Sequence, residues 1–349
     1  MKKHFFPSEG KSVYKANLHC HSTFSDGKLT PEQIKAEYSA RGYSIVAYTD
    51  HEIPFVHTEL KDESFLPITG YEASFNLDVP EKGHEYRRCY HLNLYAKRET
   101  NTVVIDPIME KIKRWNKQAN RDADYMPKYC GDFSVDEYSD ERINSFIKRA
   151  NENGYLVAVN HPAWSMQTFH DYENINGLWA IEMYNHGCAQ VGHIEDSNHI
   201  YDRLLRSGKR LWCECSDDNH NPMPLKSPDS DSFGGFTMIY ADKLDYESVM
   251  TALENGDFYA STGPTFESAY FEDGKVYIKC SPVRSIRLLN EGRDAPVAIA
   301  RKGELITEAV FDVDPDFVGK FIRVDIRDEH GKFADTNPLF AADFLKDLS

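Results

Sequence analysis

The feature that most constrains this chain is a series of short apolar runs that lead into side chains able to bind metal ions. In the first, residues 13–18 precede His19-Cys20-His21. Alternate side chains of an extended backbone share a face, so the two imidazoles can point at one centre while Cys20 points away. Neutral imidazole is the commonest metal ligand. The pair alone also fits two structural histidines, so its meaning depends on the rest of the series.

Five more apolar runs continue the series. They are residues 44–49 before Asp50-His51, 65–69 before Glu72, 90–96 with His91 at the head, 155–159 before His161, and 210–215 before Asp218 and His220. In five of the six runs the candidate ligand follows the C-terminal end, where β/α-barrel enzymes carry their chemistry. Asp26 adds a carboxylate shortly after the first pair. The pattern predicts one site built from several strand ends.

Helix signals alternate with these runs, as an α/β barrel requires. Thr30 and Gln33 stand in capping-box positions at the start of a helix that stops at Gly42. Two stretches depart from simple alternation. Residues 73–89 are expected to form a loop over the mouth of the site, and residues 100–131 an insertion packed beside it.

Beyond Pro264 the pattern becomes that of an all-β module. The pairs Asp273-Gly274, Lys302-Gly303 and His330-Gly331 each mark a hairpin turn between strand-like runs, with no helix-length periodicity among them. Residues 265–349 therefore predict a small β domain, of the sandwich type. Its one histidine stands in a turn, so we do not expect this domain to be catalytic.

Taken in order, the motifs resemble a known family. They are His19-x-His21, Ser25-Asp26-Gly27, Thr49-Asp50-His51, Gly70-x-Glu72, His91, His161-Pro162 and Asp218-x-His220. Together they resemble the PHP superfamily, the polymerase and histidinol phosphatase metallohydrolases, over residues 13–264. Residues 256–264 and the segment Asp335-Thr336-Asn337-Pro338 are similar to the branch named for carbaryl-type hydrolases. The resemblance implies a distorted (β/α)7, TIM-like barrel at residues 1–264, with the insertion at about 100–131, and a C-terminal β domain at 265–349.

The resemblance also implies how the ligands divide among three metal ions. The groups are His19, His21, Glu72 and Asp218 around the first, Glu72 bridging to a second with His91 and His161, and Asp26, His51 and His220 around the third. Relatives often have histidine at the position of Asp26, so a two-metal site is the alternative. Manganese, iron and zinc all suit such mixed ligands. Catalytic roles fall on Glu72, His51 and Asp218, while Glu182 is expected to support the ligands rather than to touch a metal.

Charge and composition limit the partners. The net charge of −16 argues against a nucleic-acid polymer as partner, because such binding needs a broad basic face. No stretch has the length and apolar character of a membrane span, and no apolar segment follows Lys2-Lys3 as in a signal peptide. We therefore expect a cytoplasmic protein without a membrane partner. The metal ions outweigh the three carboxylates, so the site should attract a small anionic substrate.

The leading hypothesis is a metal-dependent phosphoesterase that hydrolyses a small phosphorylated metabolite, a nucleotide or sugar phosphate, with a metal-bridging hydroxide. Arg87, Arg88 and Lys226 are candidate substrate contacts, although solvated surface charges fit the two arginines as well. Hydrolysis of a carbamate, ester or amide at the same metals is the alternative. A third hypothesis, from a different class of function, is a non-catalytic metal- or carbohydrate-binding protein.

Overall fold

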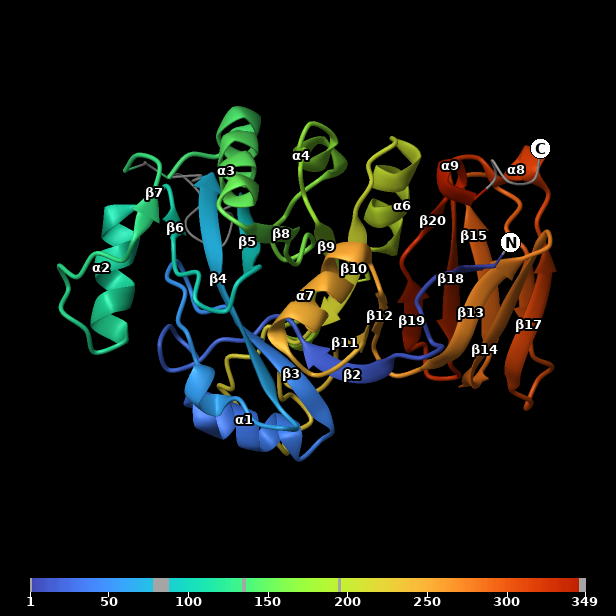
Figure 1. Cartoon of the computed structure of the whole chain (residues 1–349), viewed down its shortest axis with the longest axis horizontal. Coiled ribbons are helices and arrows are strands. Elements are labelled where there is room, and N and C mark those ends of the chain that lie inside the picture. Colours follow the sequence, from blue (N-terminus) through green and yellow to red (C-terminus); the bar gives the residue numbers. More distant parts are fainter. Residues whose placement is uncertain (1, 78–87, 134–135, 194–195, 345–349) are drawn as a thin grey trace.

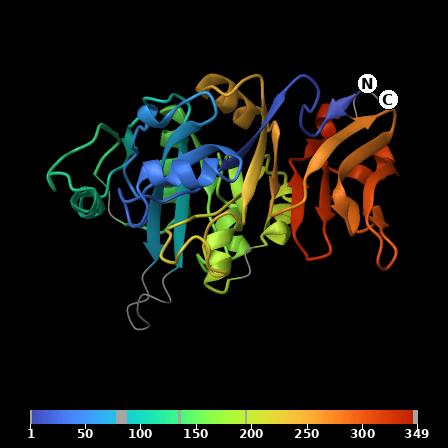
Figure 2. The ribbon, with the colours of Figure 1, turned by 90° about the horizontal axis from the view of Figure 1, so that it is seen from below.

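The computed structural model describes residues 2–77, 88–133, 136–193 and 196–344. An α/β part and a β part lie side by side along the longest axis, with both chain ends near the β part (Figure 1, Figure 2). The strands of the described residues form a 14-stranded sheet that passes through both parts, a 4-stranded sheet in the β part and a 2-stranded sheet at the far end. The long sheet therefore joins the two parts by backbone hydrogen bonds.

Nine strands build the α/β part. They are β2 (Ser12–Asn17), β3 (Tyr43–Tyr48), β4 (Leu66–Leu77), β5 (Arg88–Ala96), β8 (Tyr155–Val159), β9 (Ala180–Asn185), β10 (Trp212–Ser216), β11 (Phe236–Ala241) and β12 (Phe258–Ser261). Their order in the sheet is β10-β9-β8-β5-β4-β3-β2-β11-β12. Apart from the first half of β2, most residues of these strands are buried, which is why the strands appear in the sequence as continuous apolar runs.

The directions of the strands are mixed. β2, β3 and β4 run parallel, as do β8, β9 and β10, but β5, β11 and β12 run antiparallel to their neighbours. The resemblance implied a distorted TIM-like barrel, whose strands would run parallel, so these three strands depart from it and the barrel is not confirmed. Among the described residues β10 pairs with β9 alone, because side chains meet its other edge. The N–H of Cys213 donates to Asn337 Oδ1 at 2.9 Å, and that of Cys215 to Thr237 Oγ1 at 3.3 Å.

Helices cover the outside of this sheet. They are α1 (Pro31–Ser39), α3 (Asp140–Glu152), α4 (Phe169–Glu173), α5 (His186–Gln190), α6 (Asn198–Arg206) and α7 (Tyr246–Asn255), with a 3₁₀ turn, η1 (Thr58–Leu60). The capping box of Thr30 and Gln33 is confirmed at the start of α1. α3 buries Ile143, Phe146 and Ile147 in the core formed with β5 and β8. No helix among the described residues combines the length and apolar character needed to cross a bilayer.

The prediction of a loop at residues 73–89 is wrong at both ends. β4 continues to Leu77 and β5 begins at Arg88, so the two strands form a long antiparallel hairpin. Residues 78–87, which separate the two strands in the sequence, lie outside the described residues. The sequence does not indicate these strand ends because they are partly polar, with Ser74 and Asn76 among the paired residues.

Residues 100–131 depart from the strand–helix alternation, as the sequence suggested. Two short parallel strands, β6 (Val104–Ile105) and β7 (Tyr129–Cys130), flank α2 (Met109–Gln118). Ile112 and Trp115 of α2 pack with Ile53 and Phe55 in a small separate core. This contact fixes α2 next to the loop that follows β3.

The β part is a sandwich of two sheets. One contains β1 (Lys3–His4), β13 (Phe266–Glu272), β14 (Lys275–Val283) and β17 (Ile306–Asp312), and the other β15 (Ser285–Asn290), β16 (Val297–Ile299), β18 (Phe321–Arg327), β19 (Phe333–Thr336) and β20 (Leu339–Phe340), with short helices α8 (Pro315–Val318) and α9 (Ala341–Phe344). One apolar core contains side chains of both sheets, which confirms the sandwich. β1, which the sequence assigned to the first domain, pairs with β13.

Two of the three expected hairpins are confirmed. Asp273-Gly274 connects β13 to β14, and His330-Gly331 connects β18 to β19. Lys302-Gly303 does not form a hairpin, because β16 pairs with β15 while β17 pairs with β14 of the other sheet. A turn signal marks a reversal of the chain, and the choice of partner strand depends on the packing of the two sheets.

The junction of the two parts holds a buried charge cluster. β19 pairs with β12, and behind this ladder Arg323 of β18 is fully buried. Its guanidinium donates to the carboxylates of Asp335 and Asp202, the latter at 2.8 and 3.0 Å, and to Asn198 Oδ1 at 2.8 Å. We call these four residues the junction cluster. α6 of the α/β part thereby contacts the sandwich through charge-assisted hydrogen bonds.

Candidate metal centre

Nine side chains expected to bind metal lie together at one edge of the sheet of the α/β part. They are His19, His21 and Asp26 after β2, His51 after β3, Glu72 in β4, His91 in β5, His161 after β8, and Asp218 and His220 after β10. We call this set the histidine–carboxylate cluster. The structure thus brings together every ligand candidate of the sequence.

The position of His91 follows from the direction of β5. In the sequence it was the exception, because it stands at the head of its apolar run. β5 is antiparallel to β4 and β8, so its first residues lie beside the carboxyl end of β8. Glu72 is not at a strand end, because β4 continues five residues beyond it to Leu77. The cluster therefore lies where the β4–β5 hairpin extends beyond the carboxyl ends of the neighbouring strands.

Glu72 is at the middle of the cluster and is almost fully buried. Five imidazoles surround its carboxylate: His91 Nδ1, His161 Nε2 and His19 Nε2 lie 3.0, 3.3 and 3.4 Å from Oε1, and His51 Nδ1 and His21 Nε2 lie 3.1 and 3.4 Å from Oε2. The amide of Asn160 also donates to Oε1 at 2.8 Å. Both oxygens of one carboxylate thus face two different groups of histidines, as a bridging ligand requires.

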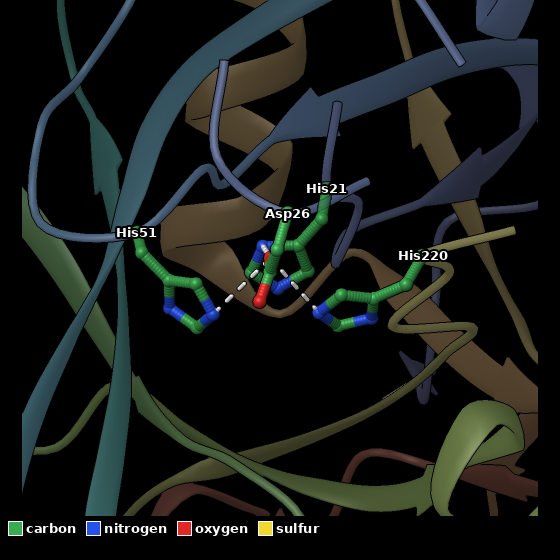
Figure 3. Close-up of side chains that lie close together, drawn as sticks. All are labelled: His21, Asp26, His51 and His220. Carbon is green, nitrogen blue, oxygen red and sulfur yellow. Dashed lines mark ion pairs between the residues drawn. The ribbon is translucent and has the colours of Figure 1, made fainter. Parts of the chain in front are cut away.

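A second group forms around Asp26 (Figure 3). Its Oδ1 lies 3.3 Å from His220 Nε2, 3.5 Å from His51 Nε2 and 3.8 Å from His21 Nδ1. The rings of His21 and His220 stack at 4.1 Å between centroids. These side chains come from three separate segments of the chain and point into a common space in the close-up. The fold therefore brings Asp26 next to His51 and His220, which are distant from it in the sequence.

Asp218 connects the first group to the second. Its Oδ1 is 3.1 Å from both His19 Nε2 and His21 Nε2, and 3.7 Å from His220 Nδ1. Asp218 adopts φ of 54°, an uncommon conformation for a residue with a side chain. Among the described residues, Asp218 Oδ1 and Asp26 Oδ1 are buried oxygens with no hydrogen-bond donor of suitable geometry. Two such acceptors amid imidazoles fit a site for cations.

The electrostatics of the cluster also fit a site for cations. Burial lowers the pKa of His19, but the charges of Asp218, Glu182 and Glu72 outweigh it and raise the pKa well above its usual value. Burial raises the pKa of Glu72, and the neighbouring His91 and His19 outweigh this and lower it. The surroundings of these imidazoles therefore favour positive charge in their midst.

Three sets of ligand atoms are close enough to share an ion, each within 4.8 Å. They are His21, Asp26, His51 and His220; His19, His21 and Glu72; and Glu72, His91 and His161. These sets follow the three groups inferred from the family resemblance, with His21 added to the third and Asp218 outside all of them. Imidazole nitrogen with carboxylate oxygen suits divalent transition metals, so the residues present fit such ions.

Neighbouring side chains hold the ligand candidates in place. Glu182 Oε1 lies 2.9 Å from His19 Nδ1 and accepts from Ser216 Oγ at 2.5 Å, while its Oε2 accepts from the N–H of His161 at 2.8 Å. Glu182 thus lies behind the cluster and contacts the far nitrogen of His19, as expected of a supporting residue. Partners of this kind fix the orientation of an imidazole and its tautomer.

Sequence reasoning missed two further supports. Asp50 accepts from Ser22 Oγ and Ser25 Oγ, both at 2.7 Å, and Ser25 Oγ lies 3.2 Å from His21 Nδ1. On the opposite side Ser165 Oγ lies 3.1 Å from His161 Nδ1. The family-like triplet Ser25-Asp26-Gly27 contained the signal for Ser25, but nothing local pointed to Ser165.

Two cavities of about 440 Å³ each open on the cluster. Asp26, His51, His91 and Trp164 line both of them. We call the first the apolar cavity, because its other walls include Cys188, Val191, Pro222 and Met223. We call the second the basic cavity, because Lys111 and Arg114 of α2 line it, together with Trp115, Asn76 and Asp136. Both volumes fall within the range of small-molecule sites.

Of the three substrate contacts inferred from the sequence, only Arg88 and Lys226 belong to the described residues, and neither lines the two cavities. Arg87 lies outside the described residues. Arg88 pairs with Asp171 of α4 at 3.3 Å, and Lys226 is exposed on the loop after β10. Their roles stay predictions. Sequence reasoning missed Lys111 and Arg114, because a helical position does not reveal which cavity a cation faces.

Comparison with known proteins finds a family similarity in the first part of the chain. Residues 17–175 match the PHP domain family. The PHP match covers the cluster from His19 to His161, while Asp218 and His220 lie beyond it. A 5'-3' exoribonuclease of Haemophilus influenzae is 31% identical over 110 residues, which cover 28% of this chain and 40% of that enzyme.

Solved structures give weaker similarities. A two-domain protein from Bacteroides vulgatus that contains a predicted PHP-like metal-dependent phosphoesterase is 15% identical, with 91% of each chain covered and a TM-score of 0.42. An amidohydrolase from Chromobacterium violaceum is also 15% identical, with 59% of this chain and 87% of that chain covered and a TM-score of 0.33. At this level of similarity neither structure bears on function.

Proposed function

We propose that the protein is a metal-dependent phosphoesterase that hydrolyses a small phosphorylated metabolite, such as a nucleotide or sugar phosphate. The observation that carries the proposal is the buried Glu72 carboxylate, which faces five imidazoles with no lysine or arginine among its described ion-pair partners. A cluster of this composition has the ligands for two or three ions of manganese, iron or zinc. Asp218 would complete one of the two sets that share Glu72, and Asp26 belongs to the third set with His21, His51 and His220.

Divalent ions at such a site lower the pKa of bound water toward 7 and neutralise the oxygens of a phosphoryl group. The chain's own residues provide position. Glu182, Ser25 and Ser165 orient the three imidazoles that they contact, so the nitrogens facing the centre are fixed before substrate arrives. The walls of the two cavities confine the substrate next to Glu72. His51 and Asp218 each contact residues of two ligand groups, and both line the apolar cavity. This position suits them to contact the reacting phosphate.

The relative from Haemophilus influenzae supports phosphoester chemistry, since its name denotes cleavage of phosphodiester bonds. The proposal for this chain remains a small substrate in the cytoplasm, without a nucleic-acid polymer or membrane as partner. The net charge of −16 favours that choice, because a polymer with many phosphates would meet repulsion over most of the surface.

A second candidate is hydrolysis of a carbamate, ester or amide, as in the carbaryl-type branch that the C-terminal motifs resemble. The apolar cavity favours it, because no lysine or arginine is among its described lining residues. A neutral substrate would fit there without a cationic partner. The same ligands would serve both reactions, so the substrate must be found by assay.

The test is phosphate release from a panel of nucleotides and sugar phosphates by protein reconstituted with manganese, iron or zinc. We expect release that disappears in His51→Ala and persists in His170→Ala, a control that removes an exposed histidine of α4. Equal release by His51→Ala and the wild type would contradict the proposal. Bound metal with no phosphate release, together with cleavage of a naphthyl carbamate, would select the second candidate.

A further inference from the structure

The two cavities differ in charge, although they share one reacting centre. Apart from the ligand candidates, the charged residues described in the apolar cavity are Asp229 and Asp231. The carboxylate of Asp231 accepts from the N–H groups of His220 and Asn221 at 2.6 and 2.8 Å, so it shapes the loop after β10. This cavity offers a neutral substituent apolar walls, and it disfavours an anion.

The basic cavity contains two cations in different states. Lys111 is already occupied: its Nζ donates to Ser74 O at 2.5 Å and Ser74 Oγ at 3.0 Å, and it lies 3.1 Å from Asp136. Arg114 is exposed and, among the described residues, has no ion pair or side-chain hydrogen bond. Of the two, Arg114 is therefore the one whose donors are available to a ligand.

Stacked rings place Arg114 near the reacting centre. Its guanidinium lies 4.6 Å from the centroid of the Trp115 ring, and that ring stacks on His51 at 4.8 Å with 26° between the planes. Trp115 is held in turn by the small core with Ile112 and Phe55. The ring of Trp115 thus lies between the guanidinium of Arg114 and the ligand candidate His51, and the packing of α2 holds it there.

From these observations we propose that the substrate is a phosphodiester with unlike substituents. This inference rests on the proposed function and deepens it. The scissile phosphate lies at the histidine–carboxylate cluster, a neutral leaving group enters the apolar cavity, and the other substituent extends into the basic cavity, where Arg114 binds a second anionic group. A monoester has one substituent and would leave one of the two cavities without a ligand. Arginine suits the second anion, because its planar donors match phosphate or carboxylate oxygens.

The reaction balances with water alone. The oxygen of water forms a bond to phosphorus, the bond between phosphorus and the leaving oxygen breaks, and the proton from water ends on the leaving group or in solvent. The products are an alcohol or phenol from the apolar cavity and a phosphomonoester that keeps the second anion.

Three p-nitrophenyl esters test the inference on the metal-loaded protein. They are p-nitrophenyl phosphate, thymidine 5'-(p-nitrophenyl phosphate) and the same diester with a 3'-phosphate. We expect a higher kcat/KM for the diesters than for the monoester, and a further rise of about tenfold from the 3'-phosphate, the size of one charge-assisted contact. In Arg114→Gln the ratio between the two diesters should fall to about one.

Arg121→Gln is the matched control. Arg121 follows α2, is exposed, stacks over Phe55 at 4.3 Å, and lines neither cavity. The diester ratio should keep its wild-type value in this variant. Calorimetric binding of thymidine 3',5'-bisphosphate against thymidine 5'-phosphate gives a readout apart from turnover, and Arg114→Gln should remove the difference in affinity.

The outcomes separate this inference from the function on which it rests. Hydrolysis of the monoester but not of the diesters would overturn the inference and leave a phosphoesterase. A diester ratio near one in the wild type, or a ratio that Arg114→Gln does not change, would overturn the role of Arg114. Failure of all three esters with metal bound would overturn the proposed function itself.

Discussion

The molecule contains two clusters of ionisable side chains that differ in how far their charges are paired within the chain. In the junction cluster a cation faces carboxylates: burial disfavours the charge of Arg323, but Asp335 and Asp202 outweigh it and raise the pKa of the guanidinium. Burial of Asp335 outweighs the nearby Arg323 and raises the pKa of that carboxyl to about 7. In the histidine–carboxylate cluster imidazoles face one another, with His19 Nε2 only 3.2 Å from His21 Nε2, and two buried oxygens lack donors. One cluster is satisfied within the chain and the other is not.

The difference indicates what each cluster is for. Polar groups in a protein interior are normally paired, and an unpaired one costs free energy unless a ligand or function requires it. The junction cluster meets this rule and joins α6 to the sandwich. The histidine–carboxylate cluster departs from it at the end of the sheet, next to two cavities. Substitutions in the two clusters should therefore change different measurable quantities.

The largest expected effect is on turnover. Glu72→Gln should lower kcat/KM for the best phosphoester about 10³-fold, because the neutral amide cannot join two groups of ligands and several kcal/mol of charge stabilisation are lost. Added manganese should raise the melting temperature of the wild type but not of this variant, since only a bound ion stabilises the folded state. Turnover of Glu72→Gln within tenfold of the wild type would contradict the bridging role.

The next effect should appear in stability alone. Arg323→Met leaves the buried Asp335 and the partly buried Asp202 without their cation, so the free energy of unfolding should fall by about 3–5 kcal/mol. Urea unfolding measures the loss, and the folded variant should keep the wild-type kcat. Arg293→Met, an exposed arginine between β15 and β16, is the control and should cost little. A loss of kcat in folded Arg323→Met would break the separation between the two clusters.

A smaller effect is expected from the residue behind the ligands. Glu182→Gln weakens the hydrogen bond that orients His19, so the affinity for manganese or zinc should fall about 10–100-fold. Metal titration followed by calorimetry measures it. Glu308→Gln, an exposed residue of β17, provides the comparison. An unchanged affinity in Glu182→Gln would show that His19 does not need this support.

The last comparison concerns a third way of burying charge, whose effect appears as a change of stability with pH. Glu214 of β10 is fully buried, accepts from Tyr95 Oη at 2.8 Å and forms no ion pair with the described residues. Burial, with the nearby charge of Glu182, raises the pKa of Glu214 from 4.5 to about 8. The folded state then holds a proton that the unfolded state releases, so stability falls as pH rises from 4.5 to about 8.

Glu214→Gln should remove this dependence. One proton contributes a slope of about 1.4 kcal/mol per pH unit, and urea unfolding at several pH values between 5 and 8 would reveal its loss. Glu308→Gln should keep the wild-type slope, because Glu308 is exposed. The same slope in Glu214→Gln as in the wild type would show that Glu214 is ionised in the fold.

The candidate site was largely predictable because its residue types recur at strand ends. Eight of the nine ligand candidates stood at or just after an apolar run, with Asp26 shortly after the first histidine pair, and periodicity places alternate side chains of a strand on one face. The β4–β5 hairpin was less predictable. Its outer ends are partly polar and were interpreted as a loop, so the antiparallel direction of β5, which brings His91 to the cluster, could not be read from the local pattern.

The residues that shape the cavities were not predictable at all. Lys111 and Arg114 are ordinary surface-like positions on a helix, and only the packing of Trp115 against His51 turns them toward the cluster. Arg88 shows the reverse: its place before His91 suggested a substrate contact, but its guanidinium pairs with Asp171 of a distant helix.

By itself, the sequence determined the strand series, the ligand types and the β module after residue 264, because these depend on local periodicity and on the chemistry of single side chains. The tertiary structure alone decided the direction of β5, the side-chain capping of β10, the continuation of one sheet into the sandwich and the unequal charge of the two cavities. These depend on contacts between segments far apart in the chain, and no local pattern encodes such contacts.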